Sequence, residues 1–249
     1  MEPPRLTRTQ RRIAATVAGL LVLGVLVLTW VRLNRPADCT VRTPDRVVQL
    51  DQREAERAAV AVAAVVRRGG STPDATRAVD RALRLSSADA GAVATALTGH
   101  AQAALSCRHG GSSVSESDRL DARGLTRRAE AVRRDMLAAF GAVPMGGFAP
   151  GGVHTGHMPG SAHYEGRAVD VFFRPVNAAN KTRGWALAQY LVAEADRLAI
   201  DTVIFDDRIW TARRGGEGWR DYHVDTSGMS PEVVRVLQHR DHVHVDVAD

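Results

Sequence analysis

Ten consecutive residues, Ser161 to Asp170, carry the side chains whose types and spacing could do chemistry. They read Ser-Ala-His-Tyr-Glu-Gly-Arg-Ala-Val-Asp, and they place His163 seven residues before Asp170, across a turn at Gly166. Asp170 falls in an apolar, β-favouring run, where an ionised carboxylate costs several kcal/mol unless a cation or hydrogen bonds compensate it. A metal ion shared with His163 would supply that compensation.

A second candidate segment, residues 241–247, reads Asp-His-Val-His-Val-Asp-Val. Side chains alternate along a strand, so His242, His244 and Asp246 would share one face and the three valines the other. The two imidazoles would lie roughly 7 Å apart at a rise of about 3.3 Å per residue. The valine face suits a hydrophobic core, which leaves the histidine face to meet the first segment.

We therefore expect His163, Asp170 and His244 to bind one Zn2+ ion. Imidazole nitrogen and carboxylate oxygen are zinc ligands, and three protein ligands with an open fourth position are typical of catalytic sites. An ion held in this way acidifies water and polarises a carbonyl group. Seven of the nine histidines follow residue 150, so this chemistry is concentrated in the last part of the chain.

These segments resemble the two motifs of the LAS superfamily of zinc peptidases. It comprises lysostaphin-type endopeptidases, D-Ala-D-Ala carboxypeptidases and dipeptidases, and the hedgehog signalling domain. The D-Ala-D-Ala branch carries Ser-x-His-x-x-Gly-x-Ala-x-Asp, and residues 161–170 match every fixed position. The closing His-x-His pair resembles the second motif, and the resemblance covers roughly residues 120–249. The chain is also similar to uncharacterised exported proteins, mostly bacterial, that carry such a domain behind a membrane segment and a helical region.

The resemblance implies that His163, Asp170 and His244 are the zinc ligands, and that His242 is the catalytic base or transition-state stabiliser. D-Ala-D-Ala enzymes place a catalytic Glu three residues before the last zinc His, where this chain has the shorter Asp241. Lysostaphin-like enzymes use the first His of the pair instead. We therefore expect His242 to act as the general base, with Asp241 in reserve.

Other polar residues near these segments have two interpretations each. Asp246 would either support a ligand imidazole or face water. Ser161 matches a motif position whose hydroxyl orients the turn, and no base is placed to make it a nucleophile. The Gly-rich loop 146–160 should let the backbone approach a cleft closely. Five further side chains would either line the cleft or belong to ordinary loops: His154, His157, Tyr164, Arg167 and His223.

The surrounding sequence predicts an α+β domain over residues 119–249. Strands and helices are interspersed without a regular β-α-β repeat, so we expect a largely antiparallel sheet with flanking helices. The resemblance implies the fold of the hedgehog and D-Ala-D-Ala-peptidase domains. Apolar periodicity and turn residues predict strands at 168–174, 202–205, 208–211 and 242–247, and helices at 125–141, 185–198 and 231–239.

An apolar run, Ile13 to Val31, predicts a membrane segment within residues 1–35. It has nineteen uncharged residues and would span about 28 Å as a helix, close to the hydrocarbon thickness of roughly 30 Å. Four arginines precede it, so we expect a single-pass anchor in the cell membrane, with the N-terminus cytoplasmic and the C-terminal domain outside. A cleaved signal peptide is the alternative, although Trp30-Val31-Arg32 offers no small-residue cleavage site.

The net charge of the chain comes from its first residues. The chain has 33 Lys and Arg and 28 Asp and Glu, of which residues 1–35 contain six and one, leaving 27 of each sign. A neutral remainder has no electrostatic footprint for a phosphate backbone, so we expect no nucleic-acid partner.

Residues 36–107 are expected to form a small Ala-rich helical region, joined to the C-terminal domain by the polar linker 108–118. Asp51 with Glu54 has the spacing of a capping box, and Thr72-Pro73 is typical of a helix start. The only two cysteines, Cys39 and Cys107, would form a disulfide in an oxidising exterior and would otherwise be buried thiols.

Together these patterns favour a membrane-anchored, extracytoplasmic zinc peptidase or amidase. The resemblance and the topology imply cell-wall peptidoglycan as the substrate. The alternative is a catalytically inactive, zinc-stabilised binding module for a cell-wall peptide or a protein partner, which the missing Glu would favour.

Overall fold

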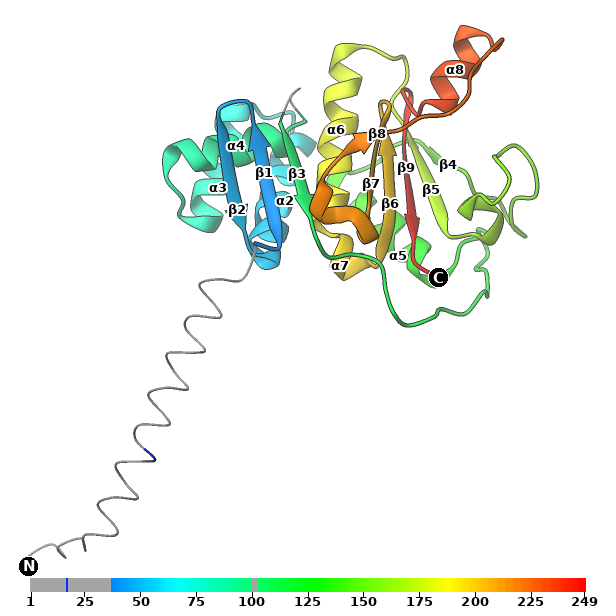
Figure 1. Ribbon diagram of the computed structural model, residues 1–249, viewed down its shortest axis with the longest axis horizontal. Coiled ribbons are helices and arrows are strands. Elements are labelled where there is room, and N and C mark those ends of the chain that lie inside the picture. The colour runs from blue at the N-terminus through cyan, green and yellow to red at the C-terminus, as the bar shows by residue number, and fades with distance from the viewer. Residues whose placement is uncertain (1–16, 18–36, 100–102) are drawn as a thin grey trace, which may run out of the picture. The chain divides into compact units, whose positions relative to one another are not determined.

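The computed structural model describes residues 17, 37–99 and 103–249 (Figure 1). The apolar run Ile13 to Val31 lies outside these ranges apart from Val17, so the membrane anchor stays a prediction. Among the described residues, no helix combines the length and the apolar character that crossing a membrane requires. Asp38–Asp249 forms one compact unit.

This unit begins with a three-stranded antiparallel sheet in the order β2-β1-β3, made of β1 (Cys39–Thr43), β2 (Arg46–Leu50) and β3 (Ala104–Cys107). Cys39 lies directly opposite Cys107, and the two form the predicted disulfide. Residues 36–107 are expected to be helical, but these strands lie within them. Each strand buries only two apolar side chains, which is too few to produce a clear period of two.

Three helices connect β2 to β3: α2 (Gln52–Arg67), α3 (Thr72–Leu83) and α4 (Ser87–Leu97). The predicted capping box of α2 is present, because the Glu54 N–H donates to Asp51 at 2.8 Å and the Asp51 N–H donates to Glu54 at 2.9 Å. The start of α3 at Thr72 is also confirmed, with Pro73 in its first turn. The α3 helix packs against α2 and α4, and most of the buried side chains in these three helices are alanines.

The larger sheet has six strands in the order β4-β5-β9-β6-β7-β8, and all neighbouring pairs are antiparallel. This confirms an α+β class with antiparallel sheets. The strands are β4 (Met145–Gly146), β5 (Ala168–Phe172), β6 (Ile200–Phe205), β7 (Arg208–Thr211), β8 (Arg220–Asp221) and β9 (His242–Val247).

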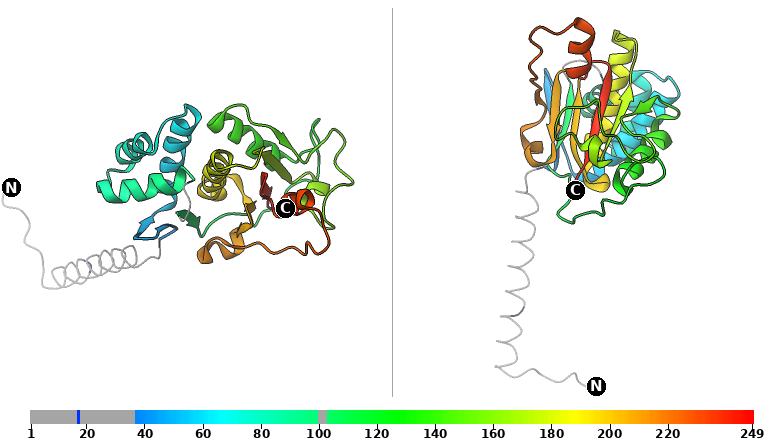
Figure 2. Two further views of the ribbon diagram at one scale, coloured as in Figure 1. Left: turned by 90° about the horizontal axis from the view of Figure 1, so that it is seen from above. Right: turned by 90° about the vertical axis from the view of Figure 1, so that its right-hand side faces the viewer.

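Two of the later helices, α5 (Arg127–Phe140) and α6 (Ala178–Ala193), pack against one face of this sheet (Figure 2). The α6 helix begins seven residues earlier than Trp185, where its apolar pattern starts, because the Asn177 side chain accepts the Asn180 N–H and caps it. The remaining elements are short: α7 (Ala195–Leu198), α8 (Pro231–Leu237), and the 3₁₀ turns η1 (Ala162–Glu165) and η2 (Ala212–Glu217).

The α6 helix also contacts the first part of the unit. The buried Leu105 N–H on β3 donates to the Gln189 side chain at 2.8 Å, and Gln52 Nε2 on α2 donates to the Ala193 carbonyl at 2.8 Å. The helix therefore lies between the two sheets and is shared by their cores. The domain boundary at residues 108–118 stays a prediction.

Candidate metal centre

A short turn delivers His163 to the large sheet. Ser161 precedes η1, and its hydroxyl accepts the His163 N–H at 3.4 Å. Gly166 ends the turn at a φ of 68°, in the left-handed region that glycine adopts without strain. The chain then enters β5 two residues later. The Ser161 hydroxyl therefore orients the turn.

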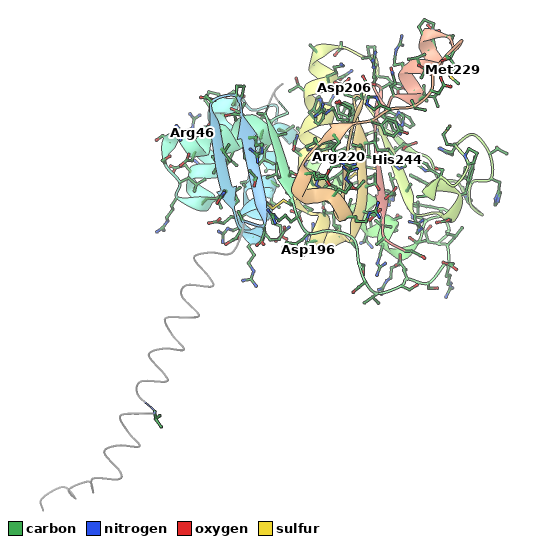
Figure 3. All side chains as sticks on the ribbon, viewed as in Figure 1. Arg46, Asp196, Asp206, Arg220, Met229 and His244 are labelled. Carbon is green, nitrogen blue, oxygen red and sulfur yellow. A yellow bond between two sulfur atoms is a disulfide. The ribbon has the colours of Figure 1, made fainter. Side chains whose placement is uncertain are left out.

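The register of β5 and β9 brings Asp170 and His244 together. The two residues lie directly opposite each other in the antiparallel pair, and Phe172 lies opposite His242. Opposite residues on adjacent strands point to the same face of a sheet. Val243 and its alternating neighbours face the core on the other side. Figure 3 labels His244 on β9 among the side chains of this sheet.

Three side-chain atoms of the predicted ligands form a nearly equilateral triangle. His163 Nε2 lies 3.2 Å from Asp170 Oδ1 and 3.1 Å from His244 Nδ1, and His244 Nδ1 lies 3.1 Å from Asp170 Oδ1. All three residues are buried. The structure therefore brings together the three residues that the sequence predicts.

A second set of contacts fixes the two imidazoles. The Nδ1–H of His163 donates to the Gly147 carbonyl at 2.7 Å, so Nε2 is the ring nitrogen that faces the triangle. The Nε2–H of His244 donates to Asp246 at 3.4 Å, so Asp246 supports this imidazole. Such partners are typical of metal-binding histidines. Gly147 must be glycine here, because a Cβ would lie 2.2 Å from His163 Cε1.

The triangle fits a tetrahedral metal site. Bonds of about 2.0–2.1 Å to zinc would place tetrahedral ligand atoms about 3.3–3.4 Å apart, close to the distances of 3.1–3.2 Å between His163, Asp170 and His244. Two nitrogens and one carboxylate oxygen are also a donor set that zinc accepts. The residues present therefore fit the ion that the sequence predicts.

The electrostatics of the cluster favour an ionised carboxylate. Burial alone would raise the pKa of Asp170, but hydrogen bonds from His163 and His244 outweigh it and hold that pKa well below its usual range. Burial opposes charge on His244 as well, yet hydrogen bonds to Asp170 and Asp246 raise the pKa of His244 to about 9. The cluster thus pairs an anionic carboxylate with a protonated imidazole.

His242 lies at the edge of the triangle and is positioned by two further residues. Its Nδ1–H donates to Asp241 Oδ1 at 2.8 Å, and its Nε2 lies 3.8 Å from Asp170 Oδ1. Arg174 Nε donates to the other oxygen of Asp241 at 2.7 Å. Both oxygens of Asp241 are therefore engaged, so this carboxylate orients His242 instead of facing the triangle.

His239 joins the cluster, although the sequence gives no hint of it. Its ring lies 4.6 Å from that of His242 and 5.5 Å from that of His244, between centroids, and Tyr222 packs edge-on against it at 5.2 Å. Burial and these neighbouring imidazoles lower the pKa of His239 to about 3. His239 follows the short α8 helix at a φ of 52°, a backbone feature with no sequence signal for a non-glycine residue.

Of the five side chains expected either to line the cleft or to belong to ordinary loops, two lie at the centre and three do not. His157 stacks on His163, and Tyr164 hydrogen-bonds the His157 backbone, so both belong to the centre. His157, His163 and Asp170 also form a group that could hold a metal ion, their ligand atoms lying within 4.8 Å of one another. His154 and His223 are exposed. Arg167 instead donates to the Val247 carbonyl at 2.7 Å and supports β9.

Two ligand sets therefore share His163 and Asp170, one completed by His244 and the other by His157. The set with His244 has the shorter separations, and its nitrogen points at the other two ligand atoms. The rings of His157 and His163 are within 22° of parallel. Their in-plane lone pairs therefore run side by side and do not converge. The observed geometry therefore favours His244 over His157 as the third member of the set.

Comparison with known proteins finds a match to a family model. A family model described as VldE, C-terminal domain, matches residues 121–231, which is less than half of the chain. The match includes His163 and Asp170 and ends before His242 and His244. No curated protein and no solved structure matches the chain.

Proposed function

We propose that residues 119–249 form a zinc-dependent peptidase or amidase of the LAS type. We further propose that the chain is anchored in the cell membrane through residues 13–31 and acts outside the cytoplasm on cell-wall peptidoglycan. The observation that carries the proposal is the triangle of His163, Asp170 and His244, with sides of 3.1–3.2 Å, beside an oriented His242. The substrate class follows from the motif resemblance and from the predicted export.

In this proposal His242 is the general base. A zinc ion, when bound, supplies Lewis acidity that polarises a carbonyl group and acidifies water. Because Asp241 accepts the Nδ1–H of His242, the lone pair on Nε2 can take a proton from the attacking water. The same nitrogen can return that proton to the leaving amine, so one imidazole serves both halves of a hydrolysis.

Asp241 and Arg174 act through His242. Arg174 packs over the Phe172 ring at 4.4 Å and pairs with Asp241, so the carboxylate is held from both sides. A carboxylate in this position favours one tautomer and one ring orientation of its histidine, as in other base–orienter pairs. We assign Asp241 as a positioning residue, which replaces its expected role as reserve base.

A second candidate is the zinc-stabilised binding module. It is favoured by the engagement of both Asp241 oxygens with other residues, because no carboxylate then stands where D-Ala-D-Ala enzymes have their catalytic Glu. In such a module the ion would hold β5, β9 and the η1 turn together without turnover. His242 would then be dispensable.

The test exposes purified peptidoglycan to the zinc-loaded full chain and to its His242→Ala variant. We expect soluble peptide fragments from the parent, a decrease of about 10²–10⁴-fold in their rate of release by the variant, and no change in bound zinc. Mass spectrometry of the fragments identifies the bond, and EDTA should abolish their release.

His154→Ala is the matched control, because this exposed histidine lies outside the cluster. It should retain the parent rate. A parent protein that binds zinc but releases no fragment from peptidoglycan, with His242→Ala behaving identically, would support the binding module and reject the hydrolase.

A further inference from the structure

His157 lies against the ligand set although it belongs to a loop outside the sheet. Its ring centroid is 3.9 Å from that of His163, and one of its nitrogens lies within 4.8 Å of ligand atoms of His163 and Asp170. Because the stacked rings are nearly parallel, His157 must rotate about its side-chain bonds to direct a lone pair at a shared ion.

A single hydroxyl fixes the backbone of His157 beside the centre. Tyr164 donates its hydroxyl proton to the His157 carbonyl at 2.5 Å and accepts the His157 N–H at 3.0 Å. Tyr164 belongs to η1 and directly follows His163. The loop is therefore attached to the same turn that carries a metal ligand, and the loss of two hydrogen bonds would release it.

Two glycines flank this attachment and leave the loop free to hinge. Gly156 and Gly160 have φ values of 91° and 75°, and a Cβ added to either would meet no atom within 4 Å. By contrast, a Cβ on Gly147, at the base of the same loop, would lie 2.2 Å from the His163 ring. The base of the loop is thus packed, whereas the backbone of His157 is held by the Tyr164 hydroxyl.

The burial of the ligands shows why movement of this loop would matter. The exposed fractions are 2 % for His163, 6 % for Asp170 and 7 % for His244. A peptide substrate must reach the fourth coordination position of a metal ion held by these three residues. The His157 ring covers one face of the His163 ring, and moving the loop would uncover that imidazole.

We propose that His157 is a fourth, reversible ligand of the metal ion, carried on a loop that hinges at Gly156 and Gly160. In the closed form, three imidazoles and Asp170 would complete the coordination, as in structural zinc sites. In the open form, three ligands would remain and the vacated position would accept substrate. This inference rests on the proposed metal centre of His163, Asp170 and His244.

Cobalt(II) loaded into the full chain in place of zinc gives a direct test. Each histidine bound to cobalt(II) shows one strongly shifted ring N–H signal in the proton NMR spectrum. We expect signals from three histidines in the parent and from two in His157→Ala. We also expect the variant to hold cobalt(II) at least about tenfold more weakly against a competing chelator.

His154→Ala and Tyr164→Phe are the matched variants. His154 is exposed on the same loop, so its replacement should leave the spectrum and the affinity unchanged. Tyr164→Phe removes both hydrogen bonds to the His157 backbone and retains the ring. It should weaken the signal assigned to His157 while the other two signals remain.

The outcomes separate the two proposals. A parent spectrum with signals from only two histidines, unchanged by His157→Ala, would overturn the fourth ligand and leave the metal centre intact. A parent chain that takes up no cobalt(II) would overturn both. Equal chelator competition by the parent and His157→Ala would also overturn the fourth ligand.

Discussion

Asp170 and Glu194 are both buried, and their surroundings have opposite effects on them. Asp170 is 6 % exposed and accepts hydrogen bonds from two imidazoles, which lower its pKa despite burial. Glu194, between α6 and α7, is 1 % exposed, and burial raises its pKa although Arg197 donates to it at 2.6 Å. Its Oε1 has no hydrogen-bond partner among the described residues.

The difference shows what a buried carboxylate needs in order to stay ionised. One arginine that is itself half exposed does not compensate for the loss of hydration at Glu194. Asp170 has hydrogen bonds from two imidazoles, and together they outweigh the loss of hydration. Burial of an acid is therefore a weak guide to function, whereas the number and identity of its partners are informative.

The largest expected effect separates the two carboxylates by metal binding. Asp170→Asn should weaken zinc binding more than about a hundredfold, since one of three ligands loses its charge. Glu194→Gln should leave the zinc affinity unchanged. Competition with a chromogenic chelator measures both. Equal losses in the two variants would show that burial alone, and not the ligand geometry, accounts for the cluster.

Two arginines each pair with a carboxylate, Arg174 with Asp241 and Arg197 with Asp135. Asp241→Asn would disturb the orientation of His242, and it should lower the rate of peptidoglycan hydrolysis by about tenfold to a hundredfold with zinc retained. Asp135→Asn, which removes a carboxylate that pairs with Arg197 at 2.7 Å, is the matched change remote from the centre and should leave the rate unchanged. An unaffected Asp241→Asn variant would contradict the positioning role.

The protonation of the metal-free centre predicts a pH dependence. His244 has a pKa raised to about 9, so at neutral pH its Nδ1 carries a proton that must leave before it can bind an ion. Zinc affinity should therefore rise by about tenfold per pH unit as the pH increases towards 9, with about one proton released per ion. Calorimetry in buffers of different ionisation enthalpy counts that proton. Affinity that is independent of pH would contradict this protonation state.

The smallest expected effect concerns stability without metal. The raised pKa of Glu194 means that its contribution to stability is complete below its ordinary value of 4.5 and is lost as the pH rises. Glu194→Gln should therefore gain on the parent between pH 5 and 8, by on the order of 1 kcal/mol. Asp170→Asn should show the opposite behaviour. Its deficit should stay constant over that range and shrink only as the pH falls below the ordinary value of 3.8. Urea unfolding at several pH values measures both differences.

Four strands of the large sheet, β5, β6, β7 and β9, could be predicted because their signals are local. The two-residue strands β4 and β8 were not predicted, because they are too short to show a pattern. The alternation in residues 242–247, the β-favouring run after Gly166 and the short strand at 208–211 each reflect contacts with immediate neighbours in the chain. The small sheet was missed because β1, β2 and β3 are four or five residues long and depend on pairing partners distant in the sequence. The early start of α6 depended on a polar cap at Asn177, which lies outside its apolar pattern.

The residues of the site also differ in whether a local sequence pattern identifies them. The spacing of the motif and the period of a strand identified His163, Asp170 and His244, and the structure brings these three together. His239 and His157 could not be identified in this way, because each reaches the centre through loop geometry. His239 needs a left-handed backbone after α8, and His157 needs the hydroxyl of Tyr164. Neither requirement has a characteristic spacing.

The pairing of Asp170 with His244 across β5 and β9 also has a consequence for how the chain folds. A slip of one residue between these strands would turn His244 to the valine side and leave Asp170 without its partner. An ion that binds only the correct alignment would lower the free energy of that alignment alone. The metal would then favour correct pairing of β5 with β9 during folding, because only this register brings the proposed ligands together.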